Sequence, residues 1–330
     1  MTKIVKFYII LGLLLAGFLP AGAQKIHYSI SPRNAERVLT QEHIRASVDW
    51  LCQADLGGRA TGTSGAFKTA VWLSNQFRSL GLEPLGGAWF HGFDTSAGMG
   101  RNVIGFLPGS GERYVIVMAH YDNLGTLAGT LYPGADSNAS GVATLVELAG
   151  MFVHMKGCRK TYTRNLILVG LDAKEKDLAG SADLWRRLSD GKLLNPATGK
   201  PVDPSQVELV VNLDQLGATL SPLTKGQPNY LMMLSDPSTG RRSQLESANL
   251  AQHLEMEIGY DYYGSKDFTR LFYENVSDQR VFLEHGIPAV MFTSGITFNN
   301  NKPSDTPETL DYAVLRRRIQ LIFYWLDKVL

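Results

Sequence analysis

The sequence predicts an α/β fold, a three-layer sandwich in which a twisted, mostly parallel sheet lies between helices on both faces. Two observations predict it. Short runs rich in Val, Ile and Leu show no alternation of apolar and polar residues, as expected for strands buried on both faces, at residues 114–119, 166–171, 207–213 and 289–292. Segments with helical spacing separate these runs, and strands that alternate with helices favour a parallel sheet between helical layers.

The spacing of apolar residues places four helices, over residues 41–54, 66–80, 138–154 and 315–326. Thr40 is a candidate N-cap for the first helix, and Gly81 is a candidate stop for the second. The stretch of residues 195–205 is rich in Pro and Gly, which predicts an excursion from the regular elements.

Residues 1–23 are expected to be a signal peptide. Two lysines precede an uncharged apolar run over residues 7–19, and an Ala-Gly-Ala cleavage site follows. The run is too short to span a bilayer, which disfavours the alternative of an N-terminal membrane anchor. We therefore expect an exported protein, periplasmic or secreted, with a single domain over residues 24–330 and no integral membrane segment after signal removal.

Composition excludes one class of partner. The chain has 32 Lys and Arg residues against 31 Asp and Glu residues, a formal net charge of +1. No basic cluster alternates with aromatic residues, so we expect no nucleic-acid partner. The two cysteines, Cys52 and Cys158, do not form a CxxC motif. Export permits a disulfide between them, but two free thiols are equally compatible with the sequence.

Polar residues of metal-binding types follow three of the predicted strands. His120 and Asp122 come after the first, Glu175 after the second and Asp214 after the third, and a turn of small residues brings in Asp136. Such folds place their sites beyond the carboxyl ends of the strands. Taken singly, each residue is explained by a hydrogen bond or a helix cap. Together, one imidazole and several carboxylates predict a divalent metal site of the zinc type, with Asp122 orienting the His120 ring.

Five motifs carry a resemblance to a known family: His120-x-Asp122, Gly134-Ala135-Asp136-x-Asn138-Ala139-Ser140-Gly141, Leu178-x-Gly180-Ser181, Asn212-Leu213-Asp214 and Gly286-Ile287-Pro288-Ala289-Val290. The chain resembles the exported co-catalytic zinc aminopeptidases of the leucyl aminopeptidase type, whose relatives include glutamate carboxypeptidases and glutaminyl cyclases. The resemblance runs from residues 58–62 to residues 303–306 and covers nearly the whole mature chain.

The resemblance implies hydrolysis at peptide N-termini by two metal ions that share Asp136 as a bridging ligand. It implies that His120 and Asp214 complete the site of one metal. Glu175 and a histidine near the C-terminus would complete the other, and the residue before Glu175 would be the general base.

The sequence departs from this pattern at two positions. The general-base position is Lys174, and the late histidine is replaced by Asn301. A protonated lysine cannot accept a proton, and loss of a general base lowers a rate by roughly 10²- to 10⁴-fold. An amide oxygen is also a poorer zinc ligand than imidazole. A third difference is Ser277-Asp278-Gln279, where relatives have Ser-Asp-His.

We interpret the first two departures together, because both fall on the same metal. The Lys174 ammonium is expected to take the vacated metal position and to pair with Asp136 and Glu175, which leaves one zinc ion rather than two. The alternative is that Lys174 points to solvent and Asn301 still binds a metal.

Two functions remain open at this stage. One is an exported zinc aminopeptidase with weakened chemistry that acts on a peptide substrate. The other, which the departures favour slightly, is a non-catalytic relative that binds a peptide or protein ligand. Glutaminyl cyclase is less favoured, because those relatives keep a single metal at the damaged position.

Overall fold

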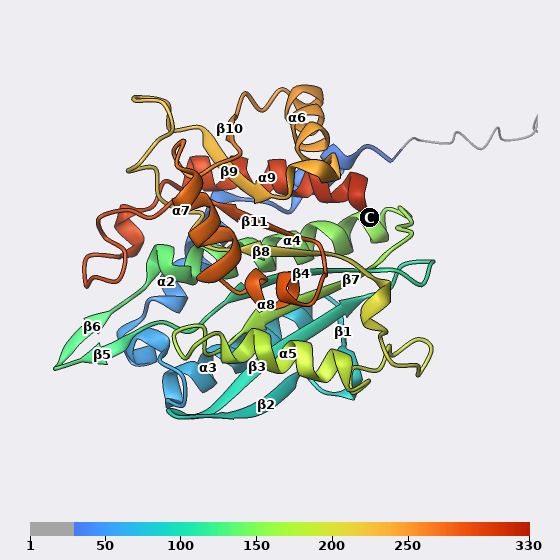
Figure 1. Cartoon of the computed structure of the whole chain (residues 1–330), viewed down its shortest axis with the longest axis horizontal. Coiled ribbons are helices and arrows are strands. Elements are labelled where there is room, and N and C mark those ends of the chain that lie inside the picture. The colour runs from blue at the N-terminus through green and yellow to red at the C-terminus, as the bar shows by residue number, and fades with distance from the viewer. Residues whose placement is uncertain (1–29) are drawn as a thin grey trace, which may run out of the picture. The chain divides into compact units, whose positions relative to one another are not determined.

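The computed structural model describes residues 30–330, so the predicted signal peptide lies outside the described residues. Within them a mixed nine-stranded sheet forms the middle layer (Figure 1). Its order is β1-β3-β7-β4-β8-β11-β9-β10, and β2 also pairs with β3. The strands are β1 (Glu83–Pro84), β2 (Phe90–Thr95), β3 (Gly98–Leu107), β4 (Tyr114–His120), β7 (Asn165–Leu171), β8 (Val207–Leu213), β9 (Tyr230–Ser235), β10 (Glu257–Gly259) and β11 (Ala289–Thr293).

Parallel pairing is confined to part of the sheet. In the centre, β4 pairs in parallel with β7 and β8, and β8 pairs in parallel with β11. The strands β1, β2 and β7 are antiparallel to β3, β11 is antiparallel to β9, and β10 is parallel to β9. The sheet as a whole is therefore mixed, and its parallel centre consists of the four strands that the apolar runs predict.

Helices cover both faces of the sheet, which confirms the predicted three-layer α/β fold. One layer contains α2 (Gln41–Leu51), α3 (Ser64–Ser79), α4 (Ser140–Gly157) and α9 (Tyr312–Val329), while α5 (Ala179–Ser189) and α8 (Gln279–Glu284) pack on the other face. Shorter or peripheral elements are α6 (Arg241–Gln252), which packs against α9, α7 (Lys266–Arg270), and the hairpin of β5 (Gly125–Leu127) and β6 (Thr130–Tyr132).

The predicted helix boundaries are close to the observed ones. Thr40 caps α2, because its hydroxyl oxygen accepts a hydrogen bond of 3.1 Å from the His43 amide. The helix ends at Leu51, three residues earlier than expected, because a 3-10 segment begins at Ala54. Helix α4 begins at Ser140, since residues 135–139 form an irregular buried turn that belongs to the candidate site.

A buried arginine connects the loops that lie beside the site. Arg59 is 0% exposed and donates hydrogen bonds to the carbonyl oxygens of Leu51, Tyr121, Pro133 and Gly134. These carbonyls belong to the end of α2, the residue after β4 and the turn before α4. A guanidinium suits this task, because its five donors have a fixed planar geometry.

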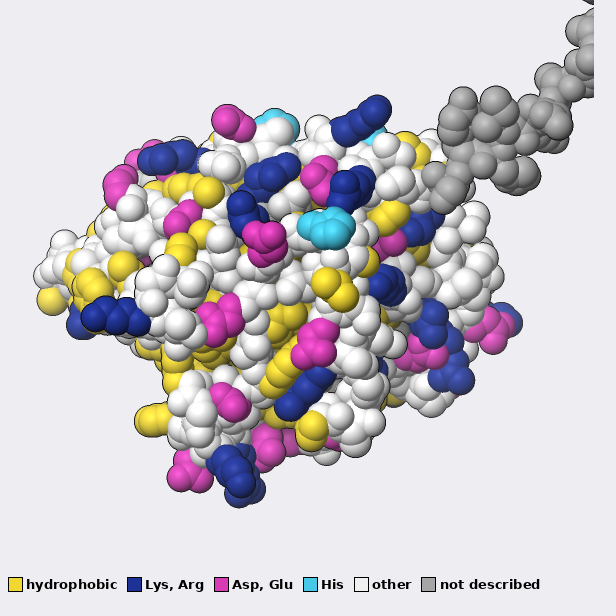
Figure 2. Space-filling view, turned by 90° about the horizontal axis from the view of Figure 1, so that it is seen from above, with side chains coloured by type: hydrophobic (Ala, Val, Ile, Leu, Met, Phe, Trp, Pro, Cys, Tyr) yellow, Lys and Arg dark blue, Asp and Glu magenta, His cyan; other side chains and the backbone are white. Residues whose placement is uncertain are grey.

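The surface carries charges of both signs. On the face shown in Figure 2, Lys and Arg side chains are interspersed with Asp and Glu side chains. Among residues 30–330, no helix has the length and apolar character needed to cross a membrane.

Candidate functional site

A cleft of about 310 Å³ lies at the carboxyl ends of the central strands. Polar residues that line it follow three strands in turn: Lys174 and Glu175 come after β7, Asp214 after β8, and Asn301 lies in the loop after β11. The location agrees with the rule that open α/β sheets place their sites beyond the carboxyl ends of the strands.

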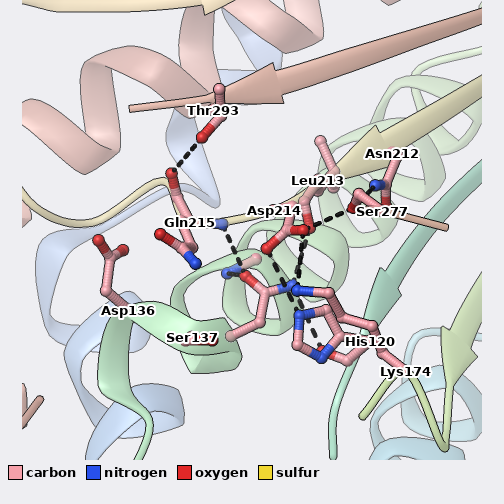
Figure 3. A network of polar contacts seen from close by, with 12 residues as sticks. His120, Asp136, Ser137, Lys174, Asn212, Leu213, Asp214, Gln215, Ser277 and Thr293 are labelled. Atoms are coloured by element: carbon pink, nitrogen blue, oxygen red, sulfur yellow. Dashed lines mark hydrogen bonds and ion pairs between the residues drawn. The ribbon is translucent and has the colours of Figure 1, made fainter. Parts of the chain in front are cut away.

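His120 and Lys174 converge on the carboxylate of Asp214 (Figure 3). The Lys174 Nζ atom lies 3.2 Å from Asp214 Oδ2, and His120 Nε2 lies 3.4 Å from Asp214 Oδ1. All three side chains are buried or nearly so, with 13% exposure for Lys174. Lys174 therefore points into the site and pairs with Asp214, not with Asp136 as expected from the sequence.

Electrostatics within this cluster keep its members charged. Burial opposes charge on Lys174, but the carboxylates of Asp214, Glu175 and Asp278 raise the pKa of Lys174 above its usual range. Burial likewise opposes charge on Asp214, but Lys174 and His120 hold the pKa of Asp214 well below its usual range. Lys174 and Asp214 thus form a buried ion pair at neutral pH.

The His120 ring is held by Asp122, which lies two residues further along the chain. Its Nδ1 atom lies 3.1 Å from the backbone oxygen of Asp122 and 3.5 Å from the Asp122 carboxylate. The same carboxylate accepts hydrogen bonds of 3.0 Å from the amides of Lys174 and Glu175. Burial and Lys174 lower the pKa of His120, but Asp122 and Asp214 outweigh them and raise it to about 9. Asp122 therefore positions both the imidazole and the backbone that carries Lys174.

The Ser277-Asp278-Gln279 segment lies beside the cluster and contacts Asp214 (Figure 3). Ser277 donates a hydrogen bond of 2.6 Å to Asp214 Oδ2, and the Asn212 amide group donates to Ser277 and to Gln279. Asp278 is fully buried, and burial raises its pKa to about 6 although His120 and Lys174 lower it. The sequence signalled this segment only as a departure from a family motif, and gave no sign that Ser277 holds Asp214.

Asp136 is not brought into the cleft. Its Oδ1 atom accepts hydrogen bonds of 2.7 Å from the Gly217 amide and 2.9 Å from the Ser140 hydroxyl, and burial and Asp305 raise its pKa to about 7. The adjacent residue, Ser137, lines the cleft instead. The expected convergence of Asp136 with His120 is therefore not observed, because the irregular backbone of this turn directs the carboxylate toward the loop after β8 (Figure 3).

Glu175 and Asn301 both line the cleft, as the sequence predicts for site residues. The Glu175 side chain is partly exposed. Its carboxylate accepts no hydrogen bond from another described residue. Its charge contributes to the raised pKa of Lys174. Asn301 is exposed and has a φ of 56°, a left-handed conformation that asparagine tolerates better than most residues.

The other wall of the cleft is apolar. It consists of Tyr262, Leu271, Phe272, Val276, Met291 and Ile296. Tyr262 and Phe272 are stacked, with 4.2 Å between their ring centroids. The cleft thus combines a charged end with an aromatic wall, which suits a ligand that has a polar and an apolar part.

The side chains at this edge of the sheet do not fit the zinc centre that the sequence resemblance implies. His120 Nε2, Asp214 Oδ1 and both carboxylate oxygens of Asp278 are buried without a hydrogen-bond partner, and so is Asp136 Oδ2, which does not line the cleft. Protein zinc sites take at least three protein ligands, and no group of three or more His, Cys, Asp or Glu side chains in residues 30–330 is arranged to hold a metal. The prediction of one zinc ion therefore depends on similarity to zinc aminopeptidases and not on a metal site among residues 30–330.

The sequence matches known proteins over most of its length. It is 24% identical to "Uncharacterized protein YfbL" of Escherichia coli over 301 residues, which cover 86% of this chain and 85% of that protein. Among solved structures, the LapA aminopeptidase of Legionella pneumophila superposes with a TM-score of 0.70 at 16% identity, over 92% of this chain and 76% of LapA. BSAP, a zinc aminopeptidase from Bacillus subtilis, superposes with a TM-score of 0.66 at 13% identity, over 88% of this chain and 95% of BSAP.

These structural similarities establish the fold, and a family model goes further. The model of peptidase family M28 matches residues 102–326, which include every strand-end residue of the cleft described above. The family match agrees with the sequence resemblance to zinc aminopeptidases. The chain belongs to peptidase family M28.

Proposed function

We propose that this chain is an exported, non-catalytic member of its family that binds a peptide in the cleft at the carboxyl ends of the strands. The observation that carries the proposal is the buried Lys174–Asp214 ion pair. Its ammonium stands at the position where the family resemblance requires a general base. A protonated lysine whose pKa is raised further cannot accept a proton from water.

The rest of the donor set supports the same conclusion. A carboxylate that is paired with an ammonium is a poor metal ligand, because a cation that displaces the ammonium must leave a buried positive charge next to itself. In the turn that contains Asp136, the residue that lines the cleft is Ser137, which provides only a hydroxyl. Asn301, at the position of the late histidine, provides only an amide. Three of the positions that line the charged end thus argue against a metal-activated water.

The cleft still has the features of a peptide-binding site. Its apolar wall, with the stacked Tyr262 and Phe272, offers a surface for a hydrophobic side chain. Glu175 offers a carboxylate with no hydrogen-bonded partner in the described chain, which suits the α-ammonium group of a peptide. We therefore expect the ligand to be a peptide with a free N-terminus and an apolar first residue.

The proposal is tested by metal content and hydrolysis, measured on the same preparations. Purified mature protein is equilibrated with zinc, freed of loosely bound ions and analysed by elemental mass spectrometry, then assayed with aminoacyl p-nitroanilides. We expect no tightly held zinc and no hydrolysis. Two zinc ions per chain with hydrolysis would overturn the proposal.

Substitutions that rebuild the donor set sharpen the test. We expect Lys174→Glu with Asn301→His to bind less zinc than the triple variant that also carries Ser137→Asp, because Ser137 lines the cleft. The matched control is a triple variant that carries Lys174→Glu, Asn301→His and Asp136→Ser. Because Asp136 does not line the cleft, this control should bind no more zinc than the double variant. Equal zinc binding by the double and triple variants would show that position 137 is not a ligand position.

Peptide binding is measured separately by calorimetry with Leu-Gly-Gly and its N-acetylated form. We expect saturable binding of the free peptide only, and weaker binding after Glu175→Gln. Equal binding of both peptides would contradict the assignment of Glu175 as the partner of the α-ammonium group.

A further inference from the structure

A second cleft, of about 460 Å³, lies on the helical layer away from the strand ends. Its walls come from α2, α3 and α4, and it shares no residue with the cleft that contains Lys174. The residues that define its character are Trp50 on α2, Trp72 on α3 and Glu147 on α4. Neither the family resemblance nor the proposed peptide-binding function uses any of these three.

Glu147 is a buried acid without a partner among residues 30–330. The residue is 8% exposed, and no hydrogen bond or ion pair joins its carboxylate to another residue of the described chain. Burial alone raises its pKa to about 7, so no positive side chain of the described residues compensates it. Buried carboxylates are normally paired or hydrogen-bonded, and this one lines an open cleft, so its partner lies outside residues 30–330.

Two tryptophans line the same cleft. Trp50 and Trp72 are stacked, with 4.9 Å between ring centroids and 13° between the ring planes, and both are only partly buried. No Lys or Arg side chain within residues 30–330 lies over either ring. An indole face attracts cations, so the aromatic wall and the carboxylate favour the same kind of ligand.

We propose that this cleft binds a small organic cation with an alkylammonium group, whose charge is neutralised by Glu147 and whose alkyl substituents pack against Trp50 and Trp72. Charge complementarity decides the class of ligand. A neutral apolar ligand would leave the buried carboxylate without a partner, and an anion would be repelled by it. His43 and Gln76, which also line the cleft, offer polar contacts near its rim.

The probe is choline, and its uncharged isostere 3,3-dimethylbutan-1-ol is the matched ligand control. Binding to the full mature protein is measured by calorimetry at pH 8. We expect saturable choline binding and at least about tenfold weaker binding of the isostere, because the isostere carries no positive charge to neutralise the buried carboxylate or to lie against the indole faces. Equal binding of both compounds, or no saturable choline binding, would overturn the proposal.

Variants identify the groups responsible. Glu147→Gln keeps the shape of the side chain and should weaken choline binding about tenfold to hundredfold. Trp72→Leu should weaken it about threefold to tenfold. Glu42→Gln is the charge-matched control, because Glu42 is an exposed acid on α2 that does not line the cleft, and it should keep the affinity of the unmodified chain. Glu147→Gln that folds, by circular dichroism, and binds choline unchanged would refute the assignment.

Discussion

Asp214 and Glu147 are both buried acids, but their surroundings are opposite. Asp214 contacts an ammonium, an imidazole and a serine hydroxyl, and its pKa is held well below its usual range. Glu147 has no partner in the described chain, and burial raises its pKa to about 7. The comparison teaches that the described chain compensates the charge of Asp214 internally in the cleft at the strand ends, while it leaves Glu147 uncompensated in a second cleft that the family resemblance does not mark.

The largest effect on stability is expected from breaking the buried ion pair between Lys174 and Asp214. Lys174→Met should lower the free energy of unfolding by about 3–5 kcal/mol, because removing one partner of a buried pair leaves the other charge uncompensated. Asp214, Glu175 and Asp278 would all lose the ammonium that now lies among them. Urea unfolding monitored by circular dichroism measures the change.

The adjacent Lys176 provides the control for this substitution. It is exposed, and Lys176→Met should change the stability by less than about 0.5 kcal/mol. A Lys174→Met variant as stable as Lys176→Met would mean that Lys174 does not compensate the acids. The double variant Lys174→Met with Asp214→Asn should be less destabilised than the sum of the single variants, since the pair is then removed together.

A smaller effect on stability is expected from the hydrogen bond between Ser277 and Asp214. Ser277→Ala should destabilise the protein by about 2 kcal/mol, because Ser277 donates to a buried charged carboxylate and also accepts from Asn212. Ser304, whose hydroxyl donates to Asn299 in a less buried setting, is the matched control. Equal effects of Ser277→Ala and Ser304→Ala would show that the charge of Asp214 does not strengthen this bond.

Much of the architecture was predictable because it depends on continuous patterns. Unbroken apolar runs predict the four strands at the parallel centre, and strand ends place His120, Lys174 and Asp214 at one edge. The strands β9 (Tyr230–Ser235) and β3 were not predicted. The apolar run of β9 lies between Pro-Asn and Asp-Pro, so its sequence did carry a strand signal, whereas glycines and polar residues interrupt β3.

The details of the site depend on features that sequence patterns do not contain. Asp136 and Ser137 are neighbours in one turn, and only the local backbone decides which of them lines the cleft. The partner of Lys174 depends on the distance between two strand ends, which residue spacing does not give. Glu147 was not singled out, because one acid on a largely apolar helix has the same sequence signature whether it reaches solvent or not.

The smallest effect on stability is expected from replacing Glu147. Unlike the substitutions of Lys174 and Ser277, this one should stabilise the protein. Burial raises the folded-state pKa of Glu147 from 4.5 to about 7, so the folded chain binds more protons than the unfolded chain between these values, and stability falls as the pH rises through this window. Glu147→Gln should match the unmodified chain at pH 4.5 and be more stable by about 1–2 kcal/mol at pH 8. Urea unfolding at the two pH values measures the gap, and a gap that does not change with pH would contradict the raised pKa. Saturating choline at pH 8 should narrow the gap, because a ligand that binds only the folded, ionised form stabilises the unmodified chain and not the variant.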